Sequence, residues 1–221
     1  MRAILLDALG TLVRLEPPAP ALRAELERRT GVDVGEEAAT RGFAAEISYY
    51  LDHHMEGRDP RSLDDLRDRC ARALADGLGM QGLEHSALRA AMLSSLSFTP
   101  YPDVAPALRE LRARGLRLVV ASNWDCSLEE WLHRAGLMEL LDGAVSSAVA
   151  GQAKPGPAVF LEALRVAGVE ASEALHVGDS PVGDVEGARA AGIRAVLLVR
   201  EGEQPAGLEA VRSLAELPSL L

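Results

Sequence analysis

Short, mostly apolar runs that end in a polar residue restrict the fold of this sequence more than any other feature. The runs occupy residues 3–6, 116–121, 174–177 and 193–199. The first is followed by Asp7, the second by Ser122, and the third by Gly178 and Asp179. Apolar runs of this length are typical of strands that are buried on both faces of a parallel sheet. The pattern therefore predicts central strands with polar residues at their carboxyl ends.

Amphipathic stretches separate the later runs, and their apolar residues recur at helical spacing. We expect helices at residues 104–114, 127–135, 158–167 and 185–191. Strands that alternate with helices imply right-handed crossovers and a parallel sheet. The sequence thus predicts an α/β fold with a Rossmann-like, doubly wound parallel sheet as its core. Ligands of such sheets bind at the carboxyl ends of the strands, where Asp7, Ser122 and Asp179 are expected.

A long segment after the first strand interrupts this alternation. From about residue 14 to residue 97 no strand pattern is found, and apolar residues recur at helical spacing at residues 22–29, 36–53, 63–78 and 88–96. We predict a core domain of residues 1–14 and 98–221, with residues 15–97 inserted as an α-helical cap domain. An insertion at this point is expected over the carboxyl edge of the sheet, where it acts as a lid that excludes water and selects the substrate.

The composition argues against several classes of protein. Basic residues number 23 and acidic residues 33, which gives a net charge of −10 and disfavours a general nucleic-acid or anionic-membrane surface. Cys70 and Cys126 are isolated, so neither a disulfide framework nor a zinc site is indicated. The first apolar run is too short for a signal peptide, and no apolar run reaches membrane-spanning length. We expect a cytoplasmic protein, and the sequence leaves its oligomeric state open.

Lys154 is the only lysine among the 23 basic residues. An ammonium group is a compact point charge, whereas a guanidinium group is wide and planar, so a narrow site that faces carboxylates or a phosphate can require lysine. The alternative is that one lysine remained by chance in an arginine-rich composition. Its position in GQAKPGPAVF, between the run that ends at Ser122 and the segment with Asp179 and Asp184, favours a functional site.

Four segments, LLDALGTL, VVASNWD, GQAKPGP and HVGDSPVGDVEGARAAG, resemble in order the four motifs of the haloacid dehalogenase superfamily. Most members of that superfamily are phosphatases. The segment YPDVAPALRELRARG also resembles the subgroup with a helical cap after the first strand, the C1-type cap of subfamily IA. The resemblance covers the whole predicted core.

The resemblance implies that Asp7 is the nucleophile, which attacks phosphorus and becomes an aspartyl phosphate. It assigns phosphate binding to Lys154 and to two pairs of residues, Gly10 with Thr11 and Ser122 with Asn123. The implied substrate is a small phosphorylated metabolite or another small anion. The alternative for Asp7 is an acidic residue that merely ends a strand, and for Ser122 and Asn123 a simple turn.

The resemblance also implies a Mg²⁺ site formed by the carboxylates of Asp7, Asp179 and Asp184 and the backbone carbonyl of Leu9. Mg²⁺ prefers such hard oxygen ligands and usually retains several waters. The alternative for Asp184 is a residue that caps a helix. Three clustered carboxylates repel one another, and a divalent cation together with Lys154 would relieve the repulsion.

Leu9 departs from the pattern of the phosphatases, which usually carry a second aspartate there as general acid and base. Leu9 retains the backbone carbonyl but cannot transfer a proton. General acid–base catalysis is commonly worth about 10² to 10⁴ in rate. We therefore expect weak or narrow phosphatase activity that favours acyl or aryl phosphates, whose leaving groups need no proton.

Two other functions stay open. A metal-independent 2-haloacid dehalogenase also needs no acid at position 9, although these enzymes generally lack the GD that this chain retains at Gly178 and Asp179. Their halide-binding arginine lies in the cap, where Arg41 has a plausible position without a motif match. The other alternative is a noncatalytic member that binds a phosphorylated ligand or a protein. No role is assigned to His53, His54 or Trp124.

Overall fold

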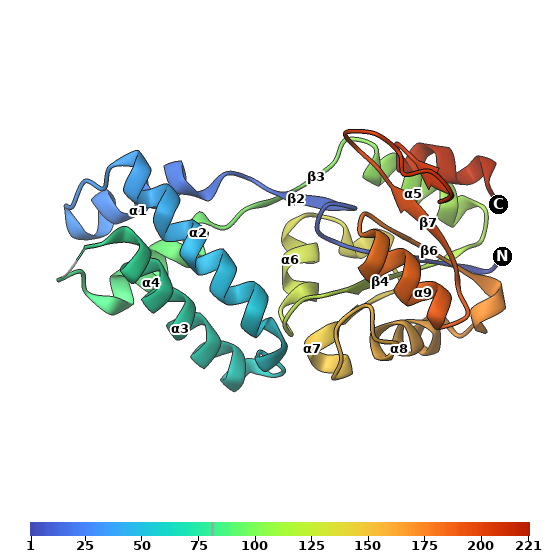
Figure 1. Ribbon diagram of the computed structural model, residues 1–221, viewed down its shortest axis with the longest axis horizontal. Helices are drawn as coiled ribbons and strands as arrows, with labels where there is room; N and C mark the ends of the chain where they lie inside the picture. The colour runs from blue at the N-terminus through green and yellow to red at the C-terminus, as the bar shows by residue number, and fades with distance from the viewer. Residues whose placement is uncertain (81) are drawn as a thin grey trace. The chain divides into compact units, whose positions relative to one another are not determined.

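The computed structural model describes residues 1–80 and 82–221, and these residues form two compact units. The core unit comprises Met1–Arg14 and Thr99–Leu221, and the helical unit comprises Leu15–Phe98. Figure 1 traces the chain from the core unit into the helical unit and back again. Each unit is described separately.

A parallel sheet forms the centre of the core unit. Its strand order is β5-β4-β1-β6-β7-β8, and every neighbouring pair is parallel. The strands are β1 (Ala3–Leu6), β4 (Arg117–Ser122), β5 (Gly143–Ser146), β6 (Ala174–Gly178), β7 (Arg194–Leu198) and β8 (Ala210–Val211). This α/β architecture confirms the predicted fold class, and the four predicted strands are present. The edge strands β5 and β8 were not predicted, because they are short and lack a distinct apolar run.

The register of the central strands determines which residues emerge together at the carboxyl edge. Leu6 of β1 pairs with Val120 of β4 on one side and with Val177 of β6 on the other. The strands β1, β4 and β6 therefore end within two residues of the same level. In addition, the Asp7 backbone N–H donates to the Val177 carbonyl oxygen at 2.9 Å, which extends the ladder by one residue.

Helices cover the sheet on both sides, and α5 and α8 lie on opposite sides of the strands in Figure 1. The helices of the core unit are α5 (Val104–Ala113), α6 (Leu128–Arg134), α7 (Ser147–Ala150), α8 (Ala158–Ala167) and α9 (Gly187–Ala190). Shorter helical turns are η2 (Met138–Leu140), η3 (Ala171–Glu173), η4 (Pro181–Glu186) and η5 (Leu214–Ser219). One face of the core buries Phe160 of α8 against residues such as Leu5 and Val119.

The last predicted helix differs from its predicted bounds. Instead of one helix over residues 185–191, a π-helical segment η4 begins at Pro181 and continues into α9. Ser180 caps this segment, since its Oγ accepts a hydrogen bond from the Gly183 N–H at 2.9 Å. Proline is well placed in a first helical turn because it has no N–H to satisfy there. The first turn is exposed and contains Pro181 and Gly183, so it lacks the apolar periodicity that predicts a helix.

The helical unit contains α1 (Pro18–Thr30), α2 (Glu36–His53), η1 (His54–Glu56), α3 (Pro60–Leu78) and α4 (His85–Ser95). Helix α3 starts with a capping box, in which the Asp59 carboxylate accepts from the Ser62 N–H and Ser62 Oγ accepts from the Asp59 N–H. Such a cap satisfies donors that the first helical turn leaves free.

Two short strands, β2 (Val13–Leu15) and β3 (Phe98–Pro100), pair where the chain passes between the units. The prediction that residues 14–97 contain no strand therefore fails at the first two residues. In the part of the chain that the structure describes, none of the helices combines the length and apolar character needed to span a membrane.

Candidate active site

Lys154 and Asp7 meet at the carboxyl edge of the sheet, within the core unit. Asp7 directly follows β1, and Lys154 lies in the loop before α8. The Lys154 Nζ donates to Asp7 Oδ1 at 2.6 Å, and the hydroxyl of Ser122, the last residue of β4, donates to the same oxygen at 2.9 Å. All three residues are buried. One oxygen of Asp7 is thus held by two donors, one from the end of β4 and one from the loop before α8.

Asn123 fixes the backbone of Lys154. Its Oδ1 accepts from the Lys154 N–H at 2.7 Å, and its Nδ2 donates to the Lys154 carbonyl oxygen at 3.2 Å. The side chain of Asn123 is therefore occupied in joining the loop after β4 to the loop that carries Lys154. The Lys154 ammonium is further held by the Ala121 carbonyl oxygen at 3.1 Å.

Asp184 is the second carboxylate that Lys154 contacts. Its Oδ1 accepts from Lys154 Nζ at 2.6 Å and is 2.8 Å from Nε2 of His176, a fully buried residue of β6. Its Oδ2 accepts from the Ser180 N–H at 2.9 Å. A Cβ atom at position 178 would lie 2.1 Å from Asp184 Cγ, so glycine at this position permits the close approach of the carboxylate.

Asp179 completes a group of three carboxylates. One oxygen from each of Asp7, Asp179 and Asp184 lies within 4.8 Å of the others, and Asp179 is the exposed member. A Cβ atom at position 10 would lie 2.1 Å from Asp179 Oδ2, and Gly10 has a φ of +83°. Glycine is therefore required at position 10 both by the conformation and by the neighbouring carboxylate.

The balance of charge shifts the pKa values of these groups in different directions. Burial raises the pKa of Asp7, and Asp184 adds to this while Lys154 opposes it. Asp179 is exposed as a residue, but partial removal of its carboxyl group from water, together with the carboxylates of Asp7 and Asp184, raises the pKa of Asp179 to about 6. Burial alone would raise the pKa of Asp184 as well, but His176 and Lys154 lower it.

The Lys154 ammonium is stabilised in its charged form. Burial acts to lower the pKa of Lys154, but the carboxylates of Asp7 and Asp184 outweigh this and raise it. One buried cation therefore stands against three clustered carboxylates, and an additional positive charge would reduce their repulsion. Three carboxylate oxygens are the donor set that hard divalent cations prefer, so the site fits the implied Mg²⁺.

The sequence of this chain matches a known protein family over most of its length. The sequence model of the hydrolase family described as haloacid dehalogenase-like hydrolase matches residues 1–192. The chain is a haloacid dehalogenase-like hydrolase. This confirms the resemblance seen in the four motifs.

Several relatives of this hydrolase carry phosphatase names. The chain is 34% identical over 212 residues to haloacid dehalogenase-like hydrolase domain-containing protein 3 of Homo sapiens, covering 90% of this chain and 82% of that protein. It is 31% identical over 212 residues to the glyceraldehyde 3-phosphate phosphatase of Methanopyrus kandleri, covering 90% and 84%.

Solved structures with the same fold include both phosphatases and dehalogenases. A phosphatase of this superfamily from Thermococcus onnurineus matches with a TM-score of 0.67 and 27% identity, over 100% of this chain and 97% of that one. A 2-haloacid dehalogenase from Pseudomonas syringae matches with a TM-score of 0.69 and 26% identity over the same shares. The fold therefore leaves the choice between these reactions to the site residues.

The positions of Gly10, Thr11 and Leu9 do not match their predicted roles directly. The Gly10 N–H donates to the Val13 carbonyl oxygen and the Thr11 N–H to that of Ala8, so the turn itself uses the backbone N–H groups of both residues that were predicted to bind phosphate. Thr11 Oγ1 is buried and, within residues 1–80 and 82–221, has no hydrogen-bond partner. Leu9 is 41% exposed, as are several other large apolar side chains of this protein.

His176 is the residue that sequence reasoning missed. It was treated as part of an apolar run, but its ring lies fully buried between Asp184 and Phe160, with an edge-to-face contact at 5.0 Å to the latter. The signal was a polar residue inside a strand that is buried on both faces. Such a residue needs a buried partner, because an unpaired polar group there is costly.

The residues without an assigned role occupy varied environments. Arg41 is exposed on α2 of the helical unit. His53 at the end of α2 and His54 at the start of η1 are half-buried. His53 stacks on Tyr49 with ring centroids 4.0 Å apart. Trp124 of the core unit is buried.

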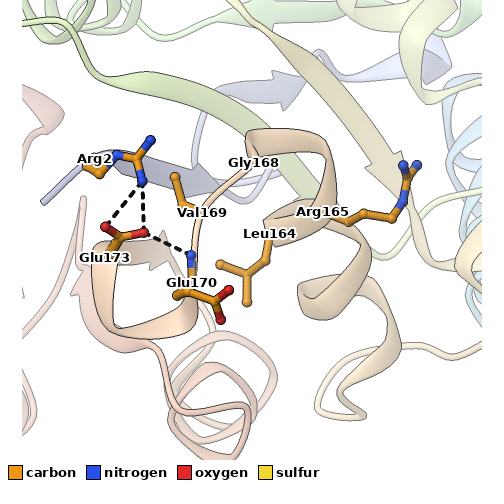
Figure 2. A pocket seen from close by; sticks show the side chains of 7 residues that line it. All are labelled: Arg2, Leu164, Arg165, Gly168, Val169, Glu170 and Glu173. Carbon is orange, nitrogen blue, oxygen red and sulfur yellow. Dashed lines mark hydrogen bonds and ion pairs between the residues drawn. The ribbon is translucent and has the colours of Figure 1, made fainter.

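A separate surface pocket lies at the opposite edge of the sheet, near the amino ends of β1 and β6. Figure 2 shows Arg2 directed toward Glu173, to which it donates two hydrogen bonds, with Gly168 at the end of α8 nearby. The pocket has a volume of about 320 Å³. Its ion pair is exposed, so the buried charges of the carboxyl edge have no counterpart in this pocket.

Proposed function

We propose that this hydrolase is a Mg²⁺-dependent phosphoric monoester hydrolase that acts through an aspartyl phosphate at Asp7. The supporting observation is the buried Lys154 ammonium, which lies 2.6 Å from both Asp7 and Asp184 within a group of three carboxylates. The phosphatase names of several relatives support the same substrate class. The substrate is a small phosphorylated metabolite, and residues 15–97 serve as the cap domain that selects it.

The proposed roles follow from the contacts of each side chain. Lys154 and Ser122 hold Asp7 Oδ1, so Oδ2 is the oxygen we assign to attack on phosphorus. The ammonium of Lys154 also stabilises negative charge on the phosphoryl oxygens as the bond to the leaving group breaks. Water then attacks the aspartyl phosphate, releases phosphate and restores the Asp7 carboxylate.

Asp7, Asp179 and Asp184 would hold the cation, together with the backbone carbonyl of Leu9. Mg²⁺ bound there would supply positive charge to the phosphoryl group during transfer. The His176 contact and the Ser180 N–H keep the Asp184 carboxylate oriented. Orientation of this kind around a ligating carboxylate commonly affects metal affinity by about 10- to 100-fold.

Leu9 narrows the proposed substrate class. Its side chain has no proton to give to a leaving oxygen, and its exposure provides an apolar surface instead. Acyl and aryl phosphates release leaving groups that are stable without protonation. We therefore propose that they are hydrolysed faster than alkyl phosphates.

The test measures release of p-nitrophenol from p-nitrophenyl phosphate with Mg²⁺ and with EDTA. We expect turnover that EDTA abolishes and that Asp7→Asn reduces at least about 10³-fold. Asp52→Asn, which changes an exposed aspartate of α2, serves as the matched control and retains turnover. Leu9→Asp is expected to raise the turnover of alkyl phosphates at least about tenfold.

A 2-haloacid dehalogenase is the second candidate, because Leu9 suits it and dehalogenase structures share the fold. The three-carboxylate group disfavours it, since a reaction without a metal gains nothing from clustered negative charge. Chloride release from 2-chloropropionate that persists in EDTA would select the dehalogenase. Binding of Mg²⁺ and phosphate without turnover of any phosphorylated metabolite would select a noncatalytic protein.

A further inference from the structure

We infer that Arg200 is a positioning residue for the loop that follows Asp7. Arg200 lies two residues after β7, and its Nε donates to the Gly10 carbonyl oxygen at 3.2 Å. Its Nη2 donates to the Thr11 carbonyl oxygen at 2.6 Å. The side chain is 16% exposed, so these bonds are largely shielded from water. Arg200 thereby fixes two consecutive peptide groups of the loop.

The same guanidinium group also holds the segment by which the chain returns to the core unit. Its Nη1 donates to Asp103 Oδ1 at 3.0 Å, and its central carbon lies 3.7 Å from the centroid of the Tyr101 ring. The backbone N–H of Tyr101 donates to the Leu12 carbonyl oxygen at 3.1 Å. Arg200 therefore joins the outgoing segment, at Gly10 and Thr11, to the returning segment at Tyr101 and Asp103.

Asp103 is itself held firmly, which makes it a fixed anchor for Arg200. Its Oδ2 accepts from Ser213 Oγ at 2.7 Å and from the Leu214 N–H at 2.9 Å. Burial acts to raise the pKa of Asp103, but these hydrogen bonds and Arg200 lower it, so the carboxylate stays charged. The loop after Asp7 is thus connected through Arg200 to the carboxyl-terminal part of the core unit.

The geometry requires arginine rather than lysine. A guanidinium group has five donors in one plane, which allows it to contact two carbonyl oxygens and a carboxylate while one face stacks on an aromatic ring. An ammonium group would keep the charge but lose the stacking and most of the hydrogen bonds. Arg200 does not act on the reacting groups directly; it acts through the backbone of Gly10, which abuts Asp179.

The effect on catalysis rests on the proposed function, but the effect on the loop does not. The loop is closed by hydrogen bonds from the N–H groups of Gly10, Leu12 and Val13 to backbone carbonyl oxygens. Hydrogen–deuterium exchange of these amides reports the order of the loop without any need for turnover. A loss of order in the loop is expected to lower kcat more than it changes KM, because the loop carries groups next to the nucleophile.

The experiment compares Arg200→Met and Arg200→Lys in the full chain with Arg194→Met. Arg194 is a matched control because it lies at the other end of β7, where it pairs with the exposed Glu209. We expect Arg200→Met to speed exchange in residues 8–14 at least about tenfold, with Arg200→Lys in the same direction, and with residues 158–167 unchanged. Arg194→Met should leave residues 8–14 unchanged. With p-nitrophenyl phosphate, kcat should fall at least about tenfold while KM changes less than about threefold.

Two results would overturn the inference. The first is unchanged exchange in residues 8–14 in both Arg200 variants. The second is a uniform rise of exchange over the whole core unit in Arg200→Lys, which would mean that Arg200 contributes only general stability. If the unaltered protein hydrolyses no phosphate ester, the proposed function fails, whereas the exchange of residues 8–14 still decides the role of Arg200.

Discussion

The carboxyl edge and the amino edge of the central sheet carry ion pairs that differ in burial. At the carboxyl edge Lys154 contacts Asp7 and Asp184, and the exposed fractions of these side chains are 4%, 8% and 2%. At the amino edge Arg2 contacts Glu173, with exposed fractions of 62% and 35%. The charged atoms lie at hydrogen-bonding distances at both edges, so distance alone does not distinguish the ion pairs. They differ in how far their side chains are buried.

This difference in burial indicates which charged residues serve function rather than stability. An exposed pair gains little because water screens it, and its net contribution is commonly about 0–1 kcal/mol. A buried pair costs several kcal/mol in desolvation for each ion, so replacing it with apolar residues often increases stability. A chain that retains three carboxylates around one buried ammonium therefore loses potential stability at this edge. The proposed catalysis and cation binding would account for that cost.

The largest effect is expected when the buried ion pairs lose their cation. Lys154→Met leaves Asp7 and Asp184 buried without their shared partner, and we expect the free energy of unfolding to fall by about 3–5 kcal/mol. Urea denaturation at pH 7 without divalent cations, followed by circular dichroism, measures the change. A loss below about 1 kcal/mol would show that the carboxylates do not depend on Lys154.

A second variant keeps the positive charge at position 154 and changes only the shape of the group that carries it. Lys154→Arg introduces a wider group between Asp7, Asp184 and the Ala121 carbonyl oxygen. We expect a loss of about 1–3 kcal/mol from overpacking, measured by the same denaturation. Arg2→Lys at the amino edge is the matched control and should change stability by less than about 0.5 kcal/mol. Equal effects at the two edges would mean that the buried site does not select lysine.

The central part of the fold was predictable from the sequence because burial on both faces leaves a direct mark. Runs such as residues 3–6 and 116–121 are apolar apart from Arg117, and they end where polar groups leave the sheet. The edge strands β5 and β8 have no such requirement, so their sequences carry no comparable signal. The start of segment η4 was missed for a related reason, since its first turn is exposed and includes Pro181 and Gly183.

The candidate site was predictable in its members but not in its connections. The spacing of the motifs indicated Asp7, Lys154 and Asp184, and the strand register explains why they meet. The pairing of Asn123 with the Lys154 backbone was not predictable, because it depends on how two loops fold against each other. Arg200 was missed because its partner Gly10 is far away in the sequence. His176 is close to Asp184 in the sequence, and it was missed because it was read as part of an apolar run.

The helical unit contains a buried carboxyl group, that of Glu46, for which no ion pair is found among residues 1–80 and 82–221. Burial raises the pKa of Glu46 to about 7, and a hydrogen bond with Cys70 only partly opposes this. The pKa is therefore higher in the folded state than the ordinary value of 4.5. Stability from the neutral carboxyl group is complete below pH 4.5, decreases as the pH rises toward 7, and is lost above that.

Replacing Glu46 with a neutral residue tests this dependence on pH. Glu46→Gln should raise the free energy of unfolding by about 1–3 kcal/mol at pH 8.5 and give no gain at pH 4. Urea denaturation across this range measures the slope. Glu37→Gln, which changes an exposed residue of the same helix, should show no comparable slope. A gain for Glu46→Gln that is independent of pH would indicate that packing, and not charge, is responsible.

The smallest effect is expected at the amino edge. Arg2→Met removes the cation of the exposed pair with Glu173, and we expect the free energy of unfolding to fall by about 0.2–1 kcal/mol. Because water and salt already screen this pair, the effect of Arg2→Met should shrink further in 1 M NaCl. The effect of Lys154→Met should persist at high salt, because dissolved ions screen buried carboxylates much less. Denaturation of both variants at low and high salt measures the contrast. Salt sensitivity of equal size at both edges would show that burial does not separate the two pairs.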